Sequence, residues 1–415
     1  MKIQPSFFVY IIIILFICKK FNYMNFIIIL FCVCFFIVLY TYIGYGVLLY
    51  ILVKVKRLVC GKSKALSLPE NDKLPEITLL ICAYNEEDIV IEKMNNCNNL
   101  NYPKEKISFL WVTDGSTDST NTLLEKYDNV RIVYSKERKG KTAALNHGII
   151  NVSTPFVAFT DANTMLNENA ILEIIRQFQN IKTGCVSGEK RVVSKSEEET
   201  ASEGEGMYWK YESTLKRWDS ELYSTMGAAG ELFAIRTPLY QNMPEDTLLD
   251  DFVMSMNILE RGYRIAYTKE AFAIEYGSAN MKEESKRKRR IAAGGIQSIW
   301  RLRSLLNPFK HPIVSFQYIS HRVLRWSVSP IALFLLIPTN IILLYRINYL
   351  YYATIILQSI FYLIAFYGYK NSIGKKKSKL AHAIYYFVFM NINVLRGLKY
   401  LYEKKDGAWE KAKRS

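Results

Sequence analysis

The sequence predicts an α/β domain with a mostly parallel sheet, flanked on both sides by membrane-spanning helices. Four short apolar runs, rich in β-branched and aromatic residues, alternate with segments of helical pattern. The runs are ITLLIC at 77–82, ISFLWVT at 107–113, VRIVYS at 130–135 and FVAF at 156–159. Helices between such runs are typical of parallel strands joined by right-handed crossovers. Long apolar segments lie toward both chain ends.

Each predicted strand ends in a polar loop followed by a helix. We expect a helix over residues 85–100 whose first turn carries acidic side chains, which suits the helix dipole. A second helix is expected up to about residue 127, with Asp118 as its cap. A third is expected from the KGK sequence at 139–141 to about residue 150.

The fourth strand runs into the sequence FTDANTML, in which Asp161 and Asn163 are two residues apart. Ligands of open α/β sheets lie at the carboxyl ends of strands. Two oxygen ligands there suit a hard divalent cation, which in turn can hold a diphosphate. The alternative is that both residues only cap a helix beginning near Asn167.

Polar residues also follow the other three strands, namely Tyr84 and Glu86, then Asp114, then Lys139 and Lys141. An aromatic ring can stack on a base, a carboxylate can accept from a base or ribose, and lysines can meet phosphate. Each side chain also has an ordinary alternative. Tyr84 could be an aromatic at the rim, Glu86 a helix-terminal charge and Lys141 a solvated lysine.

Composition favours a membrane protein over a nucleic-acid-binding one. The chain has 415 residues and a net charge of +16, and half of its residues are apolar. Many basic residues lie beside apolar spans, which the positive-inside rule explains and which places the central domain in the cytoplasm. Seven cysteines and four histidines are scattered without metal-ligand spacing, so no zinc site is predicted.

The predicted organisation has seven parts. They are a possible annotation extension or short apolar segment (1–24), a transmembrane helix (25–53), a linker (54–75), the cytoplasmic domain (76–285), an interfacial helical region (286–325), C-terminal transmembrane or interfacial helices (326–402) and a basic tail (403–415). Translation could begin at Met24. Residues 381–402 carry Asn391, Asn393 and Arg396, so this segment is predicted to be either re-entrant or packed inside the bundle.

Six motifs occur in the order found in family-2 glycosyltransferases, and the chain resembles their membrane-bound branch. That branch includes the poly-N-acetylglucosamine, hyaluronan and cellulose synthases. The motifs are CAYNEE, VTDGSTDST, KGKTAALNHGI, FTDANTML, GAAGELFAIR and LLDDFVMSMNILERGYRIAY. The resemblance covers roughly residues 76–310 and implies an A-type, Rossmann-like glycosyltransferase fold.

The resemblance implies a UDP-sugar donor with its uridine near Tyr84, Glu86 and Asp114. It places Asp161 near the diphosphate and a Mg²⁺ or Mn²⁺ ion, with Asn163 in the position of a second ligand. It makes Asp251 the general base of an inverting displacement, which suits a sugar hydroxyl that must lose its proton as it attacks. The neighbouring Asp250 is expected to bind substrate, and either aspartate could instead serve the helix N-terminus.

Two departures from the family pattern matter. Asn163 is neutral where the family has a carboxylate. In place of the Gln-x-x-Arg-Trp signature of processive synthases the chain has RKRRI at 287–291, which keeps only the cation, Arg290, as a candidate substrate-binding residue. The basic run could instead be membrane-surface charge. Trp209 could be a platform for an acceptor or part of the core.

These observations predict a hexosyltransferase of the bacterial inner membrane, multi-pass, with its catalytic domain in the cytoplasm. It would transfer a sugar from UDP-N-acetylglucosamine or a similar donor to a polysaccharide or lipid-linked acceptor. The alternatives are a processive exopolysaccharide synthase coupled to secretion and a non-catalytic scaffold of a polysaccharide-assembly complex. The expected partners are donor, acceptor, the lipid bilayer and an accessory membrane subunit, without nucleic acid.

Overall fold

The computed structural model describes residues 23–61, 66–193, 200–277, 281–371 and 378–403. The side chains of residues 200–207 are outside this description, as are the expected extension before Met24 and the basic tail. The chain divides into two compact units. The first unit lies within residues 1–45 and 324–391, and the second lies within residues 46–323 and 392–415.

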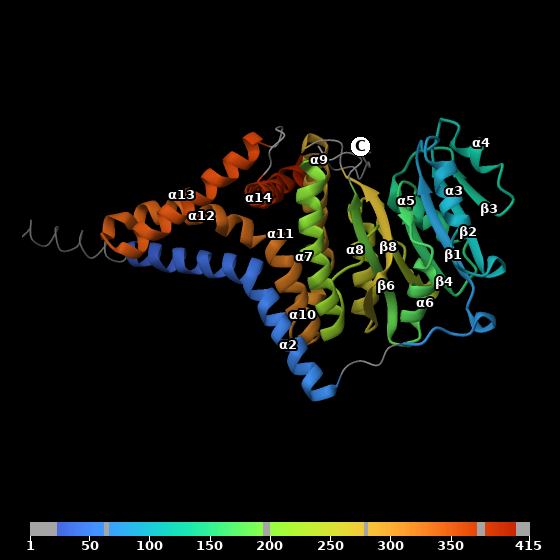
Figure 1. The fold of residues 1–415 in the computed structure, drawn as a ribbon, viewed down its shortest axis with the longest axis horizontal. Coiled ribbons are helices and arrows are strands. Elements are labelled where there is room, and N and C mark those ends of the chain that lie inside the picture. The colour runs from blue at the N-terminus through green and yellow to red at the C-terminus, as the bar shows by residue number, and fades with distance from the viewer. Residues whose placement is uncertain (1–22, 62–65, 194–199, 278–280, 372–377, 404–415) are drawn as a thin grey trace, which may run out of the picture. The chain divides into compact units, whose positions relative to one another are not determined.

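One sheet of eight strands forms the centre of the second unit, in the order β3-β2-β1-β4-β7-β6-β8-β5 (Figure 1). The strands are β1 (Ile77–Ala83), β2 (Ile107–Asp114), β3 (Val130–Ser135), β4 (Phe156–Asp161), β5 (Met165–Leu166), β6 (Thr183–Val193), β7 (Leu232–Arg236) and β8 (Arg264–Tyr276). The four predicted strands are β1 to β4, and they pair in parallel. The prediction of an α/β fold with a mostly parallel core is confirmed.

Strand β1 is buried on both faces because helices cover both. Ile77, Leu79 and Ile81 belong to the main core cluster with residues of α3 (Val90–Asn98) and α6 (Ala170–Phe178). Leu80 points to the other face, toward α5 (Lys141–Ile149), where a Cβ added at Gly148 would lie 3.1 Å from it. Two covered faces explain why the sequence of β1 is a continuous apolar run.

Helix α3 begins at Val90, so the prediction of a helix from residue 85 is wrong at its start. Asn85 has a left-handed backbone, with φ of 51°. The N–H of Glu86 donates to Thr120 Oγ1, and that of Glu87 donates to Asp118 Oδ2. The acidic residues therefore lie in a loop held to the start of α4 (Thr120–Leu124), not in a first helical turn.

The second half of the sheet was not predicted from local pattern. β7 runs antiparallel to both β4 and β6, while β6 and β8 are parallel. Three helices accompany these strands, α7 (Thr200–Leu222), α8 (Asp250–Glu260) and α9 (Met281–Arg301). Figure 1 shows α7 and α9 beside β6 and β8. The helix predicted to follow Asp250 and Asp251 is α8, as expected.

In the described part of the chain, three helices are long and apolar enough to cross a membrane: Tyr23–Cys60, Val328–Arg346 and Tyr349–Lys370. The first ends in α2 (Tyr45–Cys60), and the others contain α12 (Val328–Leu343) and α13 (Tyr349–Lys370). The short α10 (Pro312–Tyr318) and α11 (Leu324–Trp326) precede α12.

The connection between α12 and α13 is a tight turn, as predicted. Ile347 has φ of 48°, and the side chain of Asn348 accepts from Leu350 N. Residues 379–403 form α14 (Lys379–Glu403), which is not among the three candidate spans. Its Asn391 accepts a hydrogen bond from Tyr42 and its Asn393 accepts one from Ser285 of α9, so these polar side chains contact protein.

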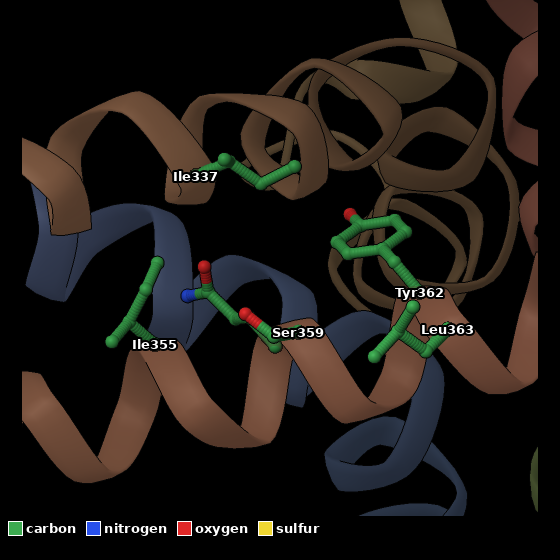
Figure 2. A pocket seen from close by; sticks show the side chains of 6 residues that line it. Ile337, Ile355, Ser359, Tyr362 and Leu363 are labelled. Carbon is green, nitrogen blue, oxygen red and sulfur yellow. The ribbon is translucent and has the colours of Figure 1, made fainter.

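An open pocket lies between α12 and α13 (Figure 2). Ile337 of α12 faces Ile355, Ser359, Tyr362 and Leu363 of α13 across it. The pocket contains none of the candidate site residues.

Candidate active site

The carboxyl ends of four strands meet at one edge of the sheet. The register pairs Cys82 of β1 with Asp161 of β4, and Asp114 of β2 with Ser135 of β3. Tyr84 follows β1 at the same level, because the preceding Ala83 pairs with Thr113. The structure thus brings the loops that carry the predicted residues to a common edge, as the parallel topology requires.

Asp114 shapes the loop between β3 and α5. Its carboxylate accepts from the backbone N–H of Lys139 (2.9 Å) and of Gly140 (2.7 Å). Gly140 has φ of 95°, a conformation that glycine adopts without strain. Asp114 therefore fixes the start of α5, whose first residue is Lys141, while the side chain of Lys139 stays exposed.

Tyr84 carries a cation on its ring. The Arg138 guanidinium lies 3.8 Å from the ring centroid, within the range of a cation–π contact. Arg138 was not predicted as a site residue, although it lies in the basic loop that precedes Lys139. Glu86 is buried, with 8% of its surface exposed, and its backbone is held by Thr120 at the start of α4.

Lys141 lies between two carboxylates. Its Nζ is 2.6 Å from Oδ1 of Asp161 and 3.7 Å from Oδ2 of Asp250. Burial would lower the pKa of Lys141, but the charges of Asp161 and Asp250 outweigh burial and hold the pKa well above its ordinary value. Lys141 is therefore a fixed cation at this edge, not a solvated lysine.

Asp251 is the second residue of α8 and lies beside Gly230, where an added Cβ would be 3.1 Å from its Oδ2. Burial, together with the negative charges of Asp250 and Glu231, raises the pKa of Asp251 to about 7, although the charge of Lys141 opposes the rise. A carboxyl group with a pKa near neutrality can take up a proton during a reaction at physiological pH.

Helix α9 positions the segment that leads into α8. Gln297 accepts from the N–H of Leu248, and Arg301 pairs with Asp246 at 2.7 Å. A Cβ added at Gly294 would lie 2.6 Å from Leu249 Cγ, so the helix and this segment are in close contact.

Arg290, also on α9, lies within the electrostatic reach of Asp250 and Asp161. Burial lowers the pKa of its guanidinium, while Asp250 and Asp161 oppose the shift. Arg287 and Lys288 are buried and pair with Glu284 at 3.2 Å and 3.3 Å. The interpretation of these two residues as membrane-surface charges is therefore wrong.

Sequence reasoning missed a buried ion-pair cluster next to Asp251. Lys190 of β6 lies 2.5 Å from Oε1 of Glu231 and also pairs with Glu275 of β8. Burial would raise the pKa of Glu231, but Lys190 reverses this and holds the pKa well below its ordinary range. Glu231 thus adds a permanent negative charge next to Gly230.

The donor set at the end of β4 is compatible with a divalent cation. Asp161 has a side chain that is 30% exposed and already binds the ammonium of Lys141. Asn163 follows two residues later and is half-buried. Within the described ranges no group of three or more His, Cys, Asp and Glu side chains could hold a metal ion. Asp161 and Asn163 together thus offer few oxygen ligands, and oxygens of a diphosphate would have to complete the shell.

The fold and this polar edge define a domain of the A-type glycosyltransferase class. Residues 78–243 match the model of the Glycosyl transferase family 2 and are a domain of that family, as the motifs predicted. Among solved structures, the mannosyltransferase PcManGT from Pyrobaculum calidifontis, in complex with GDP-Man and Mn²⁺, superposes with a TM-score of 0.68 at 20% identity. The match covers 91% of this chain and 99% of that one.

Two curated relatives are similar over about half of the chain. A probable glycosyltransferase, YdaM of Bacillus subtilis, is 27% identical over 54% of this chain and 56% of its own length. The poly-β-1,6-N-acetyl-D-glucosamine synthase of Staphylococcus aureus is 29% identical over 47% of this chain and 48% of its own. The alignments therefore span about half the length of these relatives.

Proposed function

We propose that the chain is a membrane glycosyltransferase that moves a hexose from a UDP-sugar, such as UDP-N-acetylglucosamine, to a polysaccharide or lipid-linked acceptor with inversion. The observation that carries the proposal is Asp251, a buried carboxyl group with a pKa of about 7, near the Lys141 cation at the carboxyl edge of the sheet. The naming of one relative as a poly-N-acetylglucosamine synthase supports the donor.

Each residue has a role in this proposal. Tyr84, Glu86 and Asp114 border the nucleoside, with Asp114 acting also through the loop that it holds. Lys141, Lys139 and Arg290 supply positive charge for the diphosphate, and Asp250 orients the donor sugar. As the acceptor hydroxyl attacks the anomeric carbon, Asp251 removes its proton.

A divalent cation, Mg²⁺ or Mn²⁺, would be held by Asp161 and Asn163 and, when bound, would neutralise charge on the diphosphate. Lys141 already neutralises Asp161 at 2.6 Å. The protein therefore provides its own positive charge at this point. The metal and the base, Asp251, are accordingly tested by different experiments.

The test uses membranes that contain the full chain and a panel of UDP-sugars with GDP-mannose as a comparison, scored for nucleotide release and sugar incorporation. We expect a UDP-sugar to be the preferred donor, and Asp251→Asn to remove transfer. Undiminished transfer by that variant would refute Asp251 as the base. EDTA should abolish turnover and Mg²⁺ or Mn²⁺ should restore it, whereas turnover insensitive to EDTA would remove the metal from the proposal.

The same proposal places the chain in the bacterial inner membrane. The three apolar helices support a multi-pass topology. The positive-inside bias of the sequence supports a cytoplasmic active site. Protease digestion of sealed inverted vesicles should degrade residues 76–285, and their protection in such vesicles would contradict the orientation.

A further inference from the structure

One face of α7 carries an aromatic ring and a lysine two turns apart. Trp209 and Lys216 are seven residues apart on this helix, so their side chains lie on the same side. The Lys216 ammonium lies 5.6 Å from the centroid of the Trp209 ring, and that of Lys190 lies 5.4 Å from the same centroid. Trp209 is therefore bordered by two cations.

The two lysines differ in their partners. Lys190 pairs with Glu231 and Glu275, which neutralise it. Lys216 is 4% exposed, and among the residues that the structure describes its ammonium forms no hydrogen bond and no ion pair. A buried ammonium group is costly unless its donors are used. The donors of Lys216 are therefore available for a bound molecule.

The ammonium of Lys216 also lies close enough to Asp251 to feel its charge. Burial lowers the pKa of Lys216 and Arg322 adds to this, while Glu212, Glu231 and Asp251 oppose it. Burial raises the pKa of the Cys185 thiol on β6; the charge of Asp251 raises this pKa further and the charge of Lys216 lowers it. Geometry links the Trp209 ring to Asp251: Lys190, 5.4 Å from the ring centroid, lies 2.5 Å from Glu231, and Gly230, the residue before Glu231, is in close contact with Asp251.

We propose that Trp209 and Lys216 form the subsite for the acceptor sugar, an inference that rests on the proposed function. The Trp209 ring packs against the C–H face of a pyranose, and the Lys216 ammonium donates to its hydroxyl groups. Glu231 pairs with Lys190 and Glu212 pairs with Arg322, so these charges balance each other and the ligand that we assign to the subsite is a neutral sugar residue. In the step that follows, the acceptor oxygen bonds to the anomeric carbon, its proton passes to Asp251, and the nucleoside diphosphate leaves with the electron pair of the broken bond.

The experiment separates donor chemistry from acceptor binding. Membranes with the full chain contain their own acceptor, so we would measure two rates with the UDP-sugar that the wild-type membranes turn over fastest. One rate is incorporation of radiolabelled sugar, and the other is hydrolysis of the donor by water. We expect Lys216→Met and Trp209→Ala to lower incorporation about ten-fold more than hydrolysis, equivalent to about 1.4 kcal/mol of lost acceptor binding. Trp209→Phe should keep most incorporation.

The matched control is Lys210→Met on the same helix, because Lys210 is exposed. It should leave both rates near those of the wild type. Equal losses of incorporation and hydrolysis in the Lys216 and Trp209 variants, or normal incorporation, would overturn the acceptor subsite. If Asp251→Asn retained full transfer, the role of Asp251 as the base would fail, whatever the result for the acceptor subsite. Absence of turnover with every UDP-sugar would overturn both the proposed function and the acceptor subsite.

Discussion

The ammonium of Lys141 lies 2.6 Å from Oδ1 of Asp161, at the carboxyl end of the strand whose sequence first indicated a ligand site. The same ammonium is 3.7 Å from Oδ2 of Asp250, at the start of α8. Lys141 therefore joins the end of β4 to the helix that carries the proposed base. Removing its charge would leave both carboxylates to repel each other and an incoming diphosphate.

Lys141→Met should lower kcat/KM for the nucleotide-sugar by about 100-fold, because a preorganised charge is lost where negative charge develops. Initial rates of nucleotide release at varied donor concentration measure this. Lys136→Met is the matched control, since Lys136 is an exposed lysine of the same loop after β3 and has no role in the proposed binding of the donor. Equal losses of kcat/KM in the two variants would contradict a specific role of the Lys141 charge in catalysis.

The pH profile of transfer should show the titration of Asp251. A base must be deprotonated to act, and burial raises the pKa of this carboxyl group to about 7. We therefore expect kcat/KM to rise as pH increases through about 7 and to fall as pH decreases below it. Rates measured across neutral pH at constant ionic strength check this. A profile already flat well below neutrality would exclude Asp251 as the titrating base.

Substitutions of Glu231 and Lys190 should move the pH profile of transfer in opposite directions. Glu231→Gln removes a negative charge that raises the pKa of Asp251, so the acidic limb should move to lower pH by about 1 unit. Lys190→Met leaves Glu231 without its 2.5 Å partner and should move the limb to higher pH. The double variant should return toward the wild-type profile.

Lys269→Met is the control for these variants, because Lys269 lies on β8 with an exposed side chain. Its acidic limb should stay in the wild-type position. Shifts of the same sign in the Glu231 and Lys190 variants would contradict an electrostatic effect on Asp251.

The strands that were predicted, β1 to β4, are those whose local sequence pattern is sufficient to identify them. β1, β2 and β4 are almost fully buried, which explains their apolar sequences, while β3 is the partly exposed edge strand; each of the four runs stops at a polar loop. Parallel pairing then brings Asp114 and Asp161 to one edge without further information. This is why the candidate residues could be placed together before any coordinates were known.

The parts of the fold that were not predicted depend on contacts between segments that are distant in the sequence. β6 carries Lys190 at a buried position, which is tolerated only because Glu231, just before β7, and Glu275 of β8 neutralise it. A charged residue in an apolar run hides the strand from pattern analysis. In the same way, α3 starts late because Asp118 and Thr120, more than 30 residues away, hold the backbone of the preceding loop.

Gly230 should be required for activity because of its contact with Asp251. A Cβ at this position would lie 3.1 Å from Oδ2 of Asp251, close enough to displace the carboxylate by a few tenths of an ångström. We expect Gly230→Ala to lower kcat about ten-fold with little change in melting temperature, since small misplacements of catalytic groups are costly. Gly227→Ala is the comparison: Gly227 has φ of 91° and its Cβ would lie 2.2 Å from Phe252 Cδ2, so that variant should lose stability. A Gly230→Ala variant with wild-type kcat would show that the position of the Asp251 carboxylate is not critical.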